Sequence, residues 1–494
     1  MNVIRPQITV LNSEQIAQIH ESSLQILSDV GVRVDSEGAR RIFARAIGRP
    51  VDDDGYVRIP PEWVARALST APSAIDVYDR RGDHAFRLGG GDEQVQTQLQ
   101  AQLQAQPQAQ PQARFGIGVT ALYYQDPETD DVTPFARRHM AQMVRLGNVL
   151  DSFDLISTVG IVQDVPPEWS DLYATLEMVA NTVKPLSILI SDEERFSDVL
   201  DLIVHLHGDL ASRPFVIPYF NPITPLVMNE GTTDKMRTTI ERGLPFMYSN
   251  YGMVGATTPI TPASTLVLLN AELLAGLTFS QIVQEGAPVI LGCLPAFFDM
   301  QGMGSFYDAQ SYLINLACAE MMAHYQLPHC GASGSGMGWG ADLIAGGHQW
   351  MNHLTSCMGK IGLAPFVGDN LDSKAFSPAV VIYANEVIAQ ARRLARGFPL
   401  DEASIALCEI EQAGPGGNYL TSDLTFERFR DAYFRSDIWP NLTFEEWQEQ
   451  GHPQPTRLLR RYACELLDRL APPEDHADLM ARGESFIARL STSI

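Results

Sequence analysis

The chain has 494 residues, of which 45% are hydrophobic, and it carries a formal net charge of -24. Its length and apolar content suffice for a large buried core, arranged as two or three domains or as one barrel with additions. The acidic balance argues against non-specific binding to nucleic acid or anionic lipid. It suits a cationic or neutral small substrate.

The sequence predicts a protein of the reducing cytoplasm. Its first residues, MNVIRPQITVLNSEQ, lack the basic and then apolar order of a secretory signal. The longest apolar run, TLVLLNAELLAGLTFSQIV, is interrupted by Asn270, Glu272 and Gln281, so we expect a buried helix rather than a membrane span. None of the six cysteines forms a C-x-x-C pair, and a disulfide framework is therefore not expected.

The first part of the chain predicts helices. Asn12 or Ser13 can cap a helix that runs through EQIAQIHESSLQILSDV and ends at Gly31. A second helix is expected next, and a third begins after Pro60. We interpret residues 1–88 as an N-terminal helical extension.

A run of Gln, Ala and Pro follows, over residues 89–114. Such a low-complexity segment cannot bury a core, because it lacks large apolar side chains. We interpret it as a disordered insertion.

Between residues 115 and 396, short apolar runs alternate with longer amphipathic ones. Seven runs have the composition of strands, and a helix-like segment follows each of them. Repeated units of this kind predict an α/β fold with a parallel sheet, and about seven of them favour a closed (β/α)8 TIM barrel over an open doubly wound sheet. The segment IGVTALYYQD is a candidate for a further strand. The expected helices cover residues 168–183, 193–206, 229–242, 263–284, 307–325, 341–358 and 377–396.

Residues 397–494 have a mixed texture and end in a helix expected from Thr456. The segment FRDAYFRSDIWPNLTFEEW is too rich in aromatic residues for a disordered tail. We expect a C-terminal extension that packs on the barrel.

Barrel enzymes carry their chemistry in the loops after the strands. The loops here, such as YFNPITPL and LPAFFDMQGMGSFYD, are rich in Gly, Pro and aromatic residues and poor in Lys and Arg, so they do not predict a phosphate site. Aromatic rings near strand ends can attract a quaternary ammonium ion, or they can simply pack the top of the barrel. The candidates are Phe220, Tyr248, Tyr251, Phe298, Tyr307, Trp339 and Trp350.

The stretch HCGASGSGMGWGADLIAGGHQW, residues 329–350, is the most unusual of these loops. It lacks a convincing acidic partner for a ribose, so dinucleotide binding is not expected. Its glycines either let a bulky ligand approach the backbone closely or form tight turns without a functional role.

Zinc is weakly suggested by five potential ligands within a short span. The spacing of His348 and His353 puts them on different faces of a helix, and the cysteines there fit buried small apolar residues. We therefore expect no metal site in this chain. The five residues are His329, Cys330, His348, His353 and Cys357.

The chain also resembles a known family. The stretches NTVKPLSI, NPITPL, AEMMAHYQLPHCGASG and GPGGNYLTSD are similar to the trimethylamine methyltransferase superfamily, and MVGATTPITPASTLVLLNAELLAGLTFSQIVQEGAPVILG is the strongest match. The resemblance covers about residues 10–455, and it points to members without pyrrolysine, such as glycine betaine:corrinoid methyltransferases.

The resemblance implies a barrel enzyme that moves a methyl group from a methylated amine to the Co(I) of a corrinoid. That corrinoid (cobalamin) rides on a carrier protein that docks over the barrel mouth, so no tightly bound cofactor is expected in this chain. Relatives with pyrrolysine carry it where this chain has residues 332–335, Ala-Ser-Gly-Ser. A quaternary amine already has a neutral leaving group and needs only positioning and a strong nucleophile.

We expect such a site to anchor a betaine carboxylate and to surround its cation. His348 or Asn221 are the candidate catalytic anchors, and Trp339, Tyr251 and Phe298 are the candidate walls for the cation. Asp342 is a further substrate-binding candidate that fits a helix N-terminus equally well, and Gly334 keeps the floor of the pocket open. The alternatives are trimethylamine or another methylated substrate, a zinc-assisted methyltransferase, and a non-catalytic protein that binds quaternary amines.

Overall fold

The computed structural model describes residues 3–48, 54–90, 113–332 and 336–492. Eight parallel strands close into a barrel, because β17 pairs with β6 and β13 pairs with β14. This confirms the predicted (β/α)8 barrel. In their order around it, the strands are β6 (Arg114–Ile117), β9 (Leu155–Ser157), β10 (Leu186–Ile188), β11 (Val216–Phe220), β13 (Phe246–Val254), β14 (Val289–Asp299), β16 (His329–Gly331) and β17 (Leu363–Val367).

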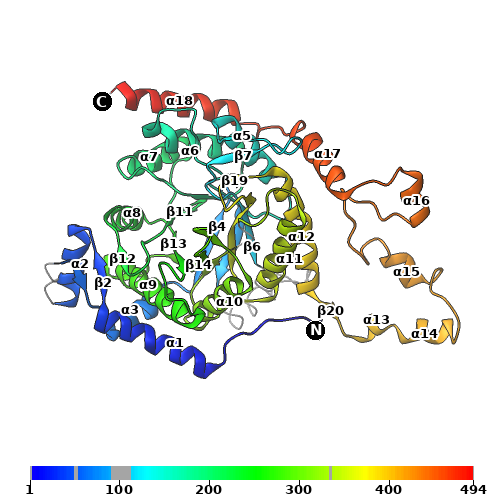
Figure 1. Ribbon diagram of the computed structural model, residues 1–494, viewed down its shortest axis with the longest axis horizontal. Helices are drawn as coiled ribbons and strands as arrows, with labels where there is room; N and C mark the ends of the chain where they lie inside the picture. Colours follow the sequence, from blue (N-terminus) through cyan, green and yellow to red (C-terminus); the bar gives the residue numbers. More distant parts are fainter. Residues whose placement is uncertain (1–2, 49–53, 91–112, 333–335, 493–494) are drawn as a thin grey trace.

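A helix follows each strand and covers the outside of the barrel (Figure 1). The seven helices expected from the sequence are all present, as α6 to α12, whereas α5 was missed. Its first turn, Arg137-Arg138-His139, is polar, and its N-cap residue makes no side-chain hydrogen bond to the helix. The eight are α5 (Arg137–Val149), α6 (Ser170–Asn181), α7 (Phe196–His207), α8 (Glu230–Glu241), α9 (Pro262–Val283), α10 (Ala309–His324), α11 (Leu343–Met358) and α12 (Pro378–Arg396).

The segment IGVTALYYQD, expected as a further barrel strand, is not the strand that completes the barrel. The eighth barrel strand is β6, which ends at Ile117, where the expected IGVTALYYQD strand begins. Gly118 has a φ of 118° and Thr120 a φ of 55°, so the chain turns out of the barrel there. The later part of that segment, β7 (Tyr123–Gln125), pairs with β8 (Val132–Pro134) and β19 (Ala375–Phe376) outside the barrel.

The N-terminal helices occur as expected: α1 (Ser13–Gln25), α2 (Glu37–Ile47) and α3 (Pro61–Thr70). The Asn12 side chain caps α1, and a five-residue π-helical turn continues it to Gly31. Short strands join this part to the barrel, with β2 (Val32–Val34) between β3 (Tyr56–Val57) and β12 (Val227–Met228).

A β-hairpin that the sequence analysis missed closes the amino end of the barrel. Strands β4 (Ala74–Tyr78) and β5 (His84–Gly89) pair antiparallel. Their inward side chains share one buried cluster with residues from the first positions of the barrel strands. The barrel is therefore sealed by the hairpin at one end, which leaves the carboxyl ends of its strands for a site. The cluster includes Ile75, Val77, Phe86 and Leu88 of the hairpin, and Leu155, Ile217, Met247, Ile290 and Leu363 of the barrel.

Helix α9 is long and apolar enough to cross a membrane by composition, with a mean hydropathy of 1.6 over its 18-residue window. In the fold 83% of that window is buried, as the sequence analysis expected of a core helix. It packs on α1, α3, β13 and α10.

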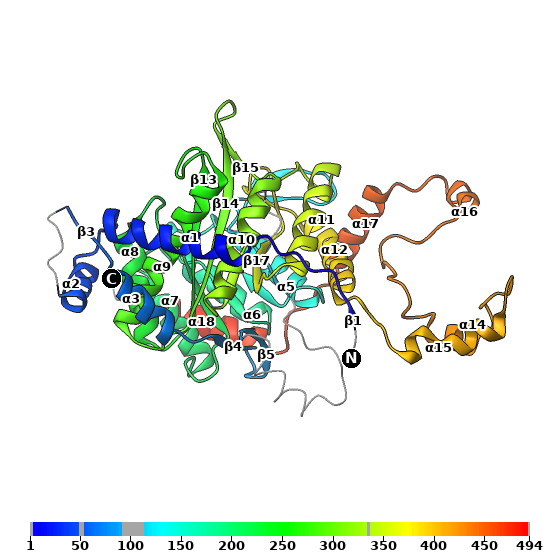
Figure 2. The same cartoon turned by 90° about the horizontal axis from the view of Figure 1, so that it is seen from below.

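After β20 (Phe398–Pro399), the C-terminal residues divide into two parts. Helix α17 (Pro455–Leu467) packs on α12, and α18 (His476–Thr492) packs on α6 and α7. The preceding helices project from the body and contain no buried residue (Figures 1 and 2). The division into segments 1–88, 89–114, 115–396 and 397–494 remains a prediction, and most of the Gln-rich segment lies outside the described residues. The projecting helices are α13 (Glu402–Ile405), α14 (Leu407–Ala413), α15 (Asp423–Arg428) and α16 (Phe444–Glu449).

Candidate active site

The carboxyl ends of the barrel strands form a mouth that two long strands extend. Strands β13 and β14 run together over nine and 11 residues, and β15 (Gly304–Phe306) pairs back onto β14. Figure 2 shows these strands projecting beyond the rest of the barrel. They carry two of the predicted cation walls, Tyr251 on β13 and Phe298 on β14, and both side chains are half-buried.

Four polar side chains and an acid gather at this mouth; we call them the mouth cluster. Tyr307 and Tyr312 are buried in a small apolar cluster against which Tyr251 packs. The hydroxyl of Tyr312 lies 2.8 Å from Nδ1 of His348. Burial raises the pKa of both Tyr251 and Tyr312, and the nearby Asp369, which follows β17, adds to both shifts. The side chains of the cluster therefore come from β13, the loop after β15, the first turns of α10 and α11, and the segment after β17.

Asp369 is the most unusual member, because it is a carboxylic acid with only 1% of its surface exposed. In the part of the chain that the structure describes, neither of its side-chain oxygens has a hydrogen bond of normal geometry. Burial raises the pKa of Asp369 to about 7, although Ser373 and the backbone of Gly336 lie near enough to lower it slightly. A buried acid without a cation is costly, and a bound cation would relieve that cost.

His348 is half-buried on α11, beside Tyr312. Burial lowers its pKa from the ordinary value of 6.5, so the ring is neutral near pH 7. If Tyr312 donates to Nδ1, the proton of the neutral ring lies on Nε2. His348 can then offer one N–H donor to a ligand, but no full charge.

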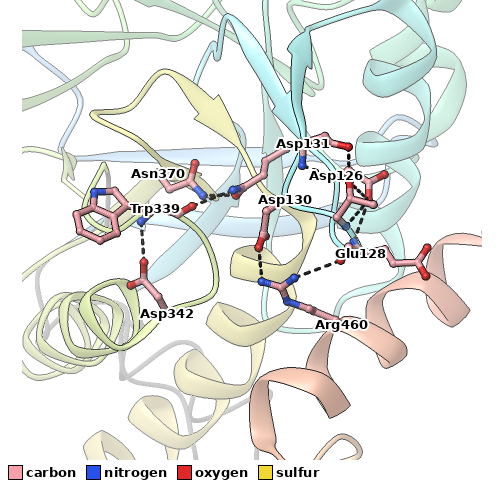
Figure 3. A network of polar contacts seen from close by, with 10 residues as sticks. Asp126, Glu128, Asp130, Asp131, Trp339, Asp342, Asn370 and Arg460 are labelled. Atoms are coloured by element: carbon pink, nitrogen blue, oxygen red, sulfur yellow. Dashed lines mark hydrogen bonds and ion pairs between the residues drawn. The ribbon is translucent and has the colours of Figure 1, made fainter.

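Among the described residues, two hydrogen bonds hold the backbone of Trp339. Gln125 donates to the Trp339 carbonyl at 2.8 Å, and the Trp339 N–H donates to Asp342 at 2.7 Å (Figure 3). The amides of Gln125 and Asn370 are in contact at 2.5 Å. The indole itself is 73% exposed, so it lies on the rim of the mouth.

Asp342 is the N-cap of α11. One of its carboxylate oxygens accepts from the N–H groups of Ile344 and Ala345, each at 2.9 Å, and the other accepts from Trp339. These bonds account for both oxygens and match the helix-terminus interpretation of this residue. Its role in substrate binding remains a prediction.

Figure 3 also shows how α17 supports this side of the barrel. Arg460 pairs with Asp130 and donates to the Glu128 carbonyl at 3.2 Å, in the turn between β7 and β8. Because β7 carries Gln125, the C-terminal helix supports the strand that holds the Trp339 loop.

Asn221 follows β11 on another side of the mouth. Oriented to satisfy its amide, its nitrogen donates to the Ser249 carbonyl at 3.2 Å and to the Pro222 carbonyl at 2.9 Å. The loop that it begins is held by Glu272 of α9, which accepts from the Leu226 N–H at 2.7 Å and from the Thr224 hydroxyl at 2.9 Å. No described contact joins Asn221 to His348.

The five potential zinc ligands do not converge. His353 is buried and lies 2.5 Å from the Gln349 oxygen, whereas Cys330 faces the barrel interior. His329 is buried with neither ring nitrogen hydrogen-bonded among the described residues. Among those residues, no three His, Cys, Asp or Glu side chains are arranged to hold a metal ion.

Sequence reasoning named His348, Tyr251 and Tyr307 but missed Asp369 and Tyr312. Gly334 lies outside the described residues, so the structure says nothing of its role. The signal for Asp369 was its place directly after β17, where a barrel carries chemistry.

Known proteins resemble the chain over most of its length. The family described as Trimethylamine methyltransferase (MTTB) matches residues 2–106 and 111–494. Trimethylamine methyltransferase MttB of Desulfitobacterium hafniense (strain DSM 10664 / DCB-2) is 24% identical over 465 residues, covering 93% of this chain and 90% of that protein. Glycine betaine methyltransferase of Desulfitobacterium hafniense (strain Y51) is 23% identical over 495 residues, covering 99% and 98%. The solved structure of Methanosarcina barkeri monomethylamine methyltransferase (MtmB) matches with a TM-score of 0.51 at 9% identity, covering 94% of this chain and 89% of that one, and shows the shared fold.

Proposed function

Because the chain belongs to the trimethylamine methyltransferase family, we propose that this methyltransferase takes its methyl group from a quaternary amine of the glycine betaine type. The acceptor is the corrinoid of a separate carrier protein. The reaction takes place in the cytoplasm, where the six free cysteines stay reduced.

The observation that carries this proposal is a buried acid, Asp369, at the end of β17 at the same mouth as Tyr251 and Tyr312, which pack together. A quaternary ammonium ion cannot donate a hydrogen bond, so a site recognises it by charge and by aromatic faces. Asp369 supplies the charge at the mouth and the tyrosines supply the rings. Binding of the cation would favour the ionised form of Asp369, which burial alone disfavours.

A betaine also carries a carboxylate, for which His348 is the proposed anchor. Its Nδ1 is held by Tyr312 at 2.8 Å, so the ring orientation is fixed before the ligand arrives. Asn221 is the second candidate, on the side of β11. Together these groups would orient one methyl of the ammonium toward the open end of the barrel and exclude water from around it.

The rim suits contact with a carrier that brings the corrinoid. Exposed apolar side chains lie along it, including Trp339 at 73% and Leu343 at 96% exposure on the α11 side, and Met303 at 72% near β15. When bound, the corrinoid would supply the nucleophile that accepts the methyl. This chain would contribute the binding, orientation and desolvation of the donor.

The assay that tests the proposal mixes the protein with free or carrier-bound cob(I)alamin and a panel of betaines that includes glycine, proline and carnitine types. We expect at least one of them to yield methylcobalamin, together with calorimetric binding that Asp369→Asn weakens at least tenfold. If no betaine and no methylated amine yields methylcobalamin, the proposed activity is wrong. Binding without turnover would instead indicate a quaternary-amine binding protein.

A further inference from the structure

Three buried side chains with reactive groups lie outside the mouth cluster, between the barrel wall and α10; we call them the thiol cluster. They are Cys293 of β14, Cys318 of α10 and His329 of β16, and each is at most 3% exposed. Cys293 is the register partner of Gly331 in the parallel pair of β14 and β16. Because strand side chains alternate, His329 and Gly331 share one face of β16, and Cys330 lies on the other. Cys330 belongs to the cluster inside the barrel, so the shared face is the outer one, toward α10.

Helix α10 approaches this outer face closely, because β16 has a glycine there. A Cβ atom at Gly331 would lie 2.3 Å from Oδ1 of Asn315 and 2.8 Å from the ring of His329. Asn315 and Cys318 are three residues apart on α10, so they lie on the same face of that helix. The absent side chain therefore lets α10 and the His329 ring come together over the barrel wall, beside Cys293.

The thiol cluster contains one ionised and one protonated sulfur. The side chains of Cys293 and Cys318 are in hydrogen-bonding contact, and His329 also contacts Cys318. The contact with Cys293 lowers the pKa of Cys318, burial opposes this, and the His329 ring adds to the lowering. The contact with Cys318 and burial raise the pKa of Cys293 well above the ordinary thiol value. Cys318 is therefore the thiolate, which is the reactive form of a cysteine, and Cys293 donates to it.

We propose that Cys293 and Cys318 are a modification site, at which a small peroxide oxidises the two thiols to a disulfide. In the first step the Cys318 thiolate attacks an oxygen of hydrogen peroxide. The S–O bond forms, the O–O bond breaks, and the departing hydroxide leaves as water with the proton that Cys318 gave up. In the second step Sγ of Cys293 displaces the hydroxyl group of this sulfenic acid. The S–S bond forms, and the hydroxyl group leaves as a second water with the proton of Cys293.

The balance of this reaction needs only the peroxide. Two electrons pass from the thiols to hydrogen peroxide, which is reduced to two molecules of water. Hydrogen peroxide is little larger than water, so a local opening of the fold suffices to admit it, whereas a bulky disulfide such as oxidised glutathione needs a much larger one. In a reducing compartment the pair stays as two thiols until a peroxide reaches it.

The disulfide would also act on the loop that follows β16. A disulfide holds its two Cα atoms within about 7 Å of each other, so it fixes α10 against β14. Asn315, on the same face of α10 as Cys318, accepts from the Ala332 N–H at 3.2 Å. The thiol cluster is therefore connected to the start of the glycine-rich stretch at the barrel mouth.

The test exposes the reduced full-length protein to hydrogen peroxide, unfolds it in iodoacetamide and maps its cysteines by mass spectrometry. We expect a peptide linked through Cys293 and Cys318, which dithiothreitol separates again. Cys330 is the internal control, because it is equally buried, at 1% exposure, and burial raises its pKa. It should remain a thiol that iodoacetamide alkylates. Cys293→Ser should leave Cys318 as a sulfenic acid that dimedone traps, and Cys318→Ser should leave Cys293 alkylated.

The wild-type protein alone can overturn the proposal. Alkylation of both Cys293 and Cys318, at a peroxide dose that oxidises the exposed Cys408, would show that the pair is inert. A disulfide from either of them to Cys330 would also contradict it, because the pairing would then not follow the contact between Cys293 and Cys318. These measurements need no substrate and no turnover, so their outcome is independent of the proposed function and of how well the variants fold.

Discussion

The hydroxyl of Tyr312 and Nδ1 of His348 lie 2.8 Å apart and connect α10 to the next helix, α11, at the barrel mouth. Burial lowers the pKa of His348, so the neutral ring needs an orienting partner more than a charged neighbour. The Tyr312 hydroxyl serves as that partner, and burial keeps it protonated by raising its own pKa.

Tyr312→Phe removes this hydrogen bond and keeps the ring. We expect the affinity for a betaine to fall by about five- to tenfold, which corresponds to a lost hydrogen bond of roughly 1 kcal/mol. The thermal midpoint should change little. Calorimetric titration measures the affinity, and Tyr173→Phe, on α6, is the control expected to bind normally. Equal affinity of the Tyr312 variant and the wild type would remove His348 from the binding site.

Asp369 predicts that ligand binding depends on pH. Burial raises its pKa to about 7, far above the ordinary value for an aspartate. A cation needs the ionised form, so the affinity for a betaine should rise with pH until about 7 and then level off. Asp369→Asn should bind weakly at every pH, and titrations across that range compare the two.

The raised pKa of Asp369 also makes the stability of the folded protein depend on pH, which tests whether Asp369 has a binding role or a structural role. A raised carboxyl pKa favours the folded state only at low pH, and the contribution is lost as pH rises through about 7. Asp369→Asn should therefore increase the thermal midpoint of the ligand-free protein by several degrees at alkaline pH. A variant that both binds poorly and melts earlier there would mark Asp369 as a structural residue.

The barrel could be predicted because its units repeat. Each of seven apolar runs is followed by an amphipathic segment, and this alternation can be recognised in the sequence without knowing which residues are in contact. The first unit escaped because β6 has only four residues and a β7–β8 hairpin separates it from α5. The β4–β5 hairpin was missed although Ile75, Val77, Phe86 and Leu88 alternate in the sequence, since it directly follows α3 in a segment interpreted as a helical extension.

The site was less predictable, because burial decides its chemistry. An aspartate at position 369 looks like any loop acid until the fold encloses it to 1% exposure. Trp339 is still a predicted wall for a cation, and the hydrogen bonds that hold it within the described residues go to its backbone, which no sequence pattern indicates. Distances between α10, α11 and the end of β17 come from closure of the barrel, which no local pattern encodes.

We expect substitution of Glu272 to lower the stability of the fold strongly. It is 2% exposed and holds the loop after β11 through the Leu226 N–H and the Thr224 hydroxyl, while Asn250 donates to it at 2.8 Å. Glu272→Ala leaves these donors buried and unpaired, so we expect a loss of about 3 kcal/mol in unfolding free energy. Glu272→Gln should lose less, because its oxygen still accepts. Urea unfolding measures the stability of both variants. Equal stability of the two variants and the wild type would show that the hydrogen bonds of Glu272 do not stabilise this loop.

A substitution at Trp339 can distinguish an effect on substrate binding from an effect on contact with the carrier protein. Its ring is 73% exposed, and the loop is held through backbone atoms that Ala also has. We expect Trp339→Ala to change betaine affinity less than about twofold, within the spread of ordinary surface substitutions. Turnover with a carrier protein should fall more than turnover with free cob(I)alamin. A large loss of affinity would instead return the indole to the cation site, where the sequence placed it.

The buried ring of His353 makes the free energy of unfolding depend on pH in acid. Its ring is fully buried next to Gln349 and meets Phe115 edge-on, with centroids 5.3 Å apart. Burial, and then Arg392, lower its pKa to about 3. The unfolded chain binds a proton at His353 near pH 6.5, whereas the folded chain binds it only near pH 3. The contribution of the neutral ring to the free energy of unfolding is therefore complete above about pH 6.5 and is lost as the pH falls toward about 3.

His353→Leu removes that titration. The free energy of unfolding should then fall less steeply between about pH 6 and about pH 4, by about 1.4 kcal/mol for each pH unit, even if the variant is less stable overall. Urea midpoints measured across this interval give the slope. His84→Gln, at a histidine of β5 whose side chain is 52% exposed and lies 3.1 Å from Asp76, is the comparison variant that removes an imidazole from the surface. A slope unchanged in His353→Leu would mean that the folded protein accepts the proton after all, and would contradict the lowered pKa of His353.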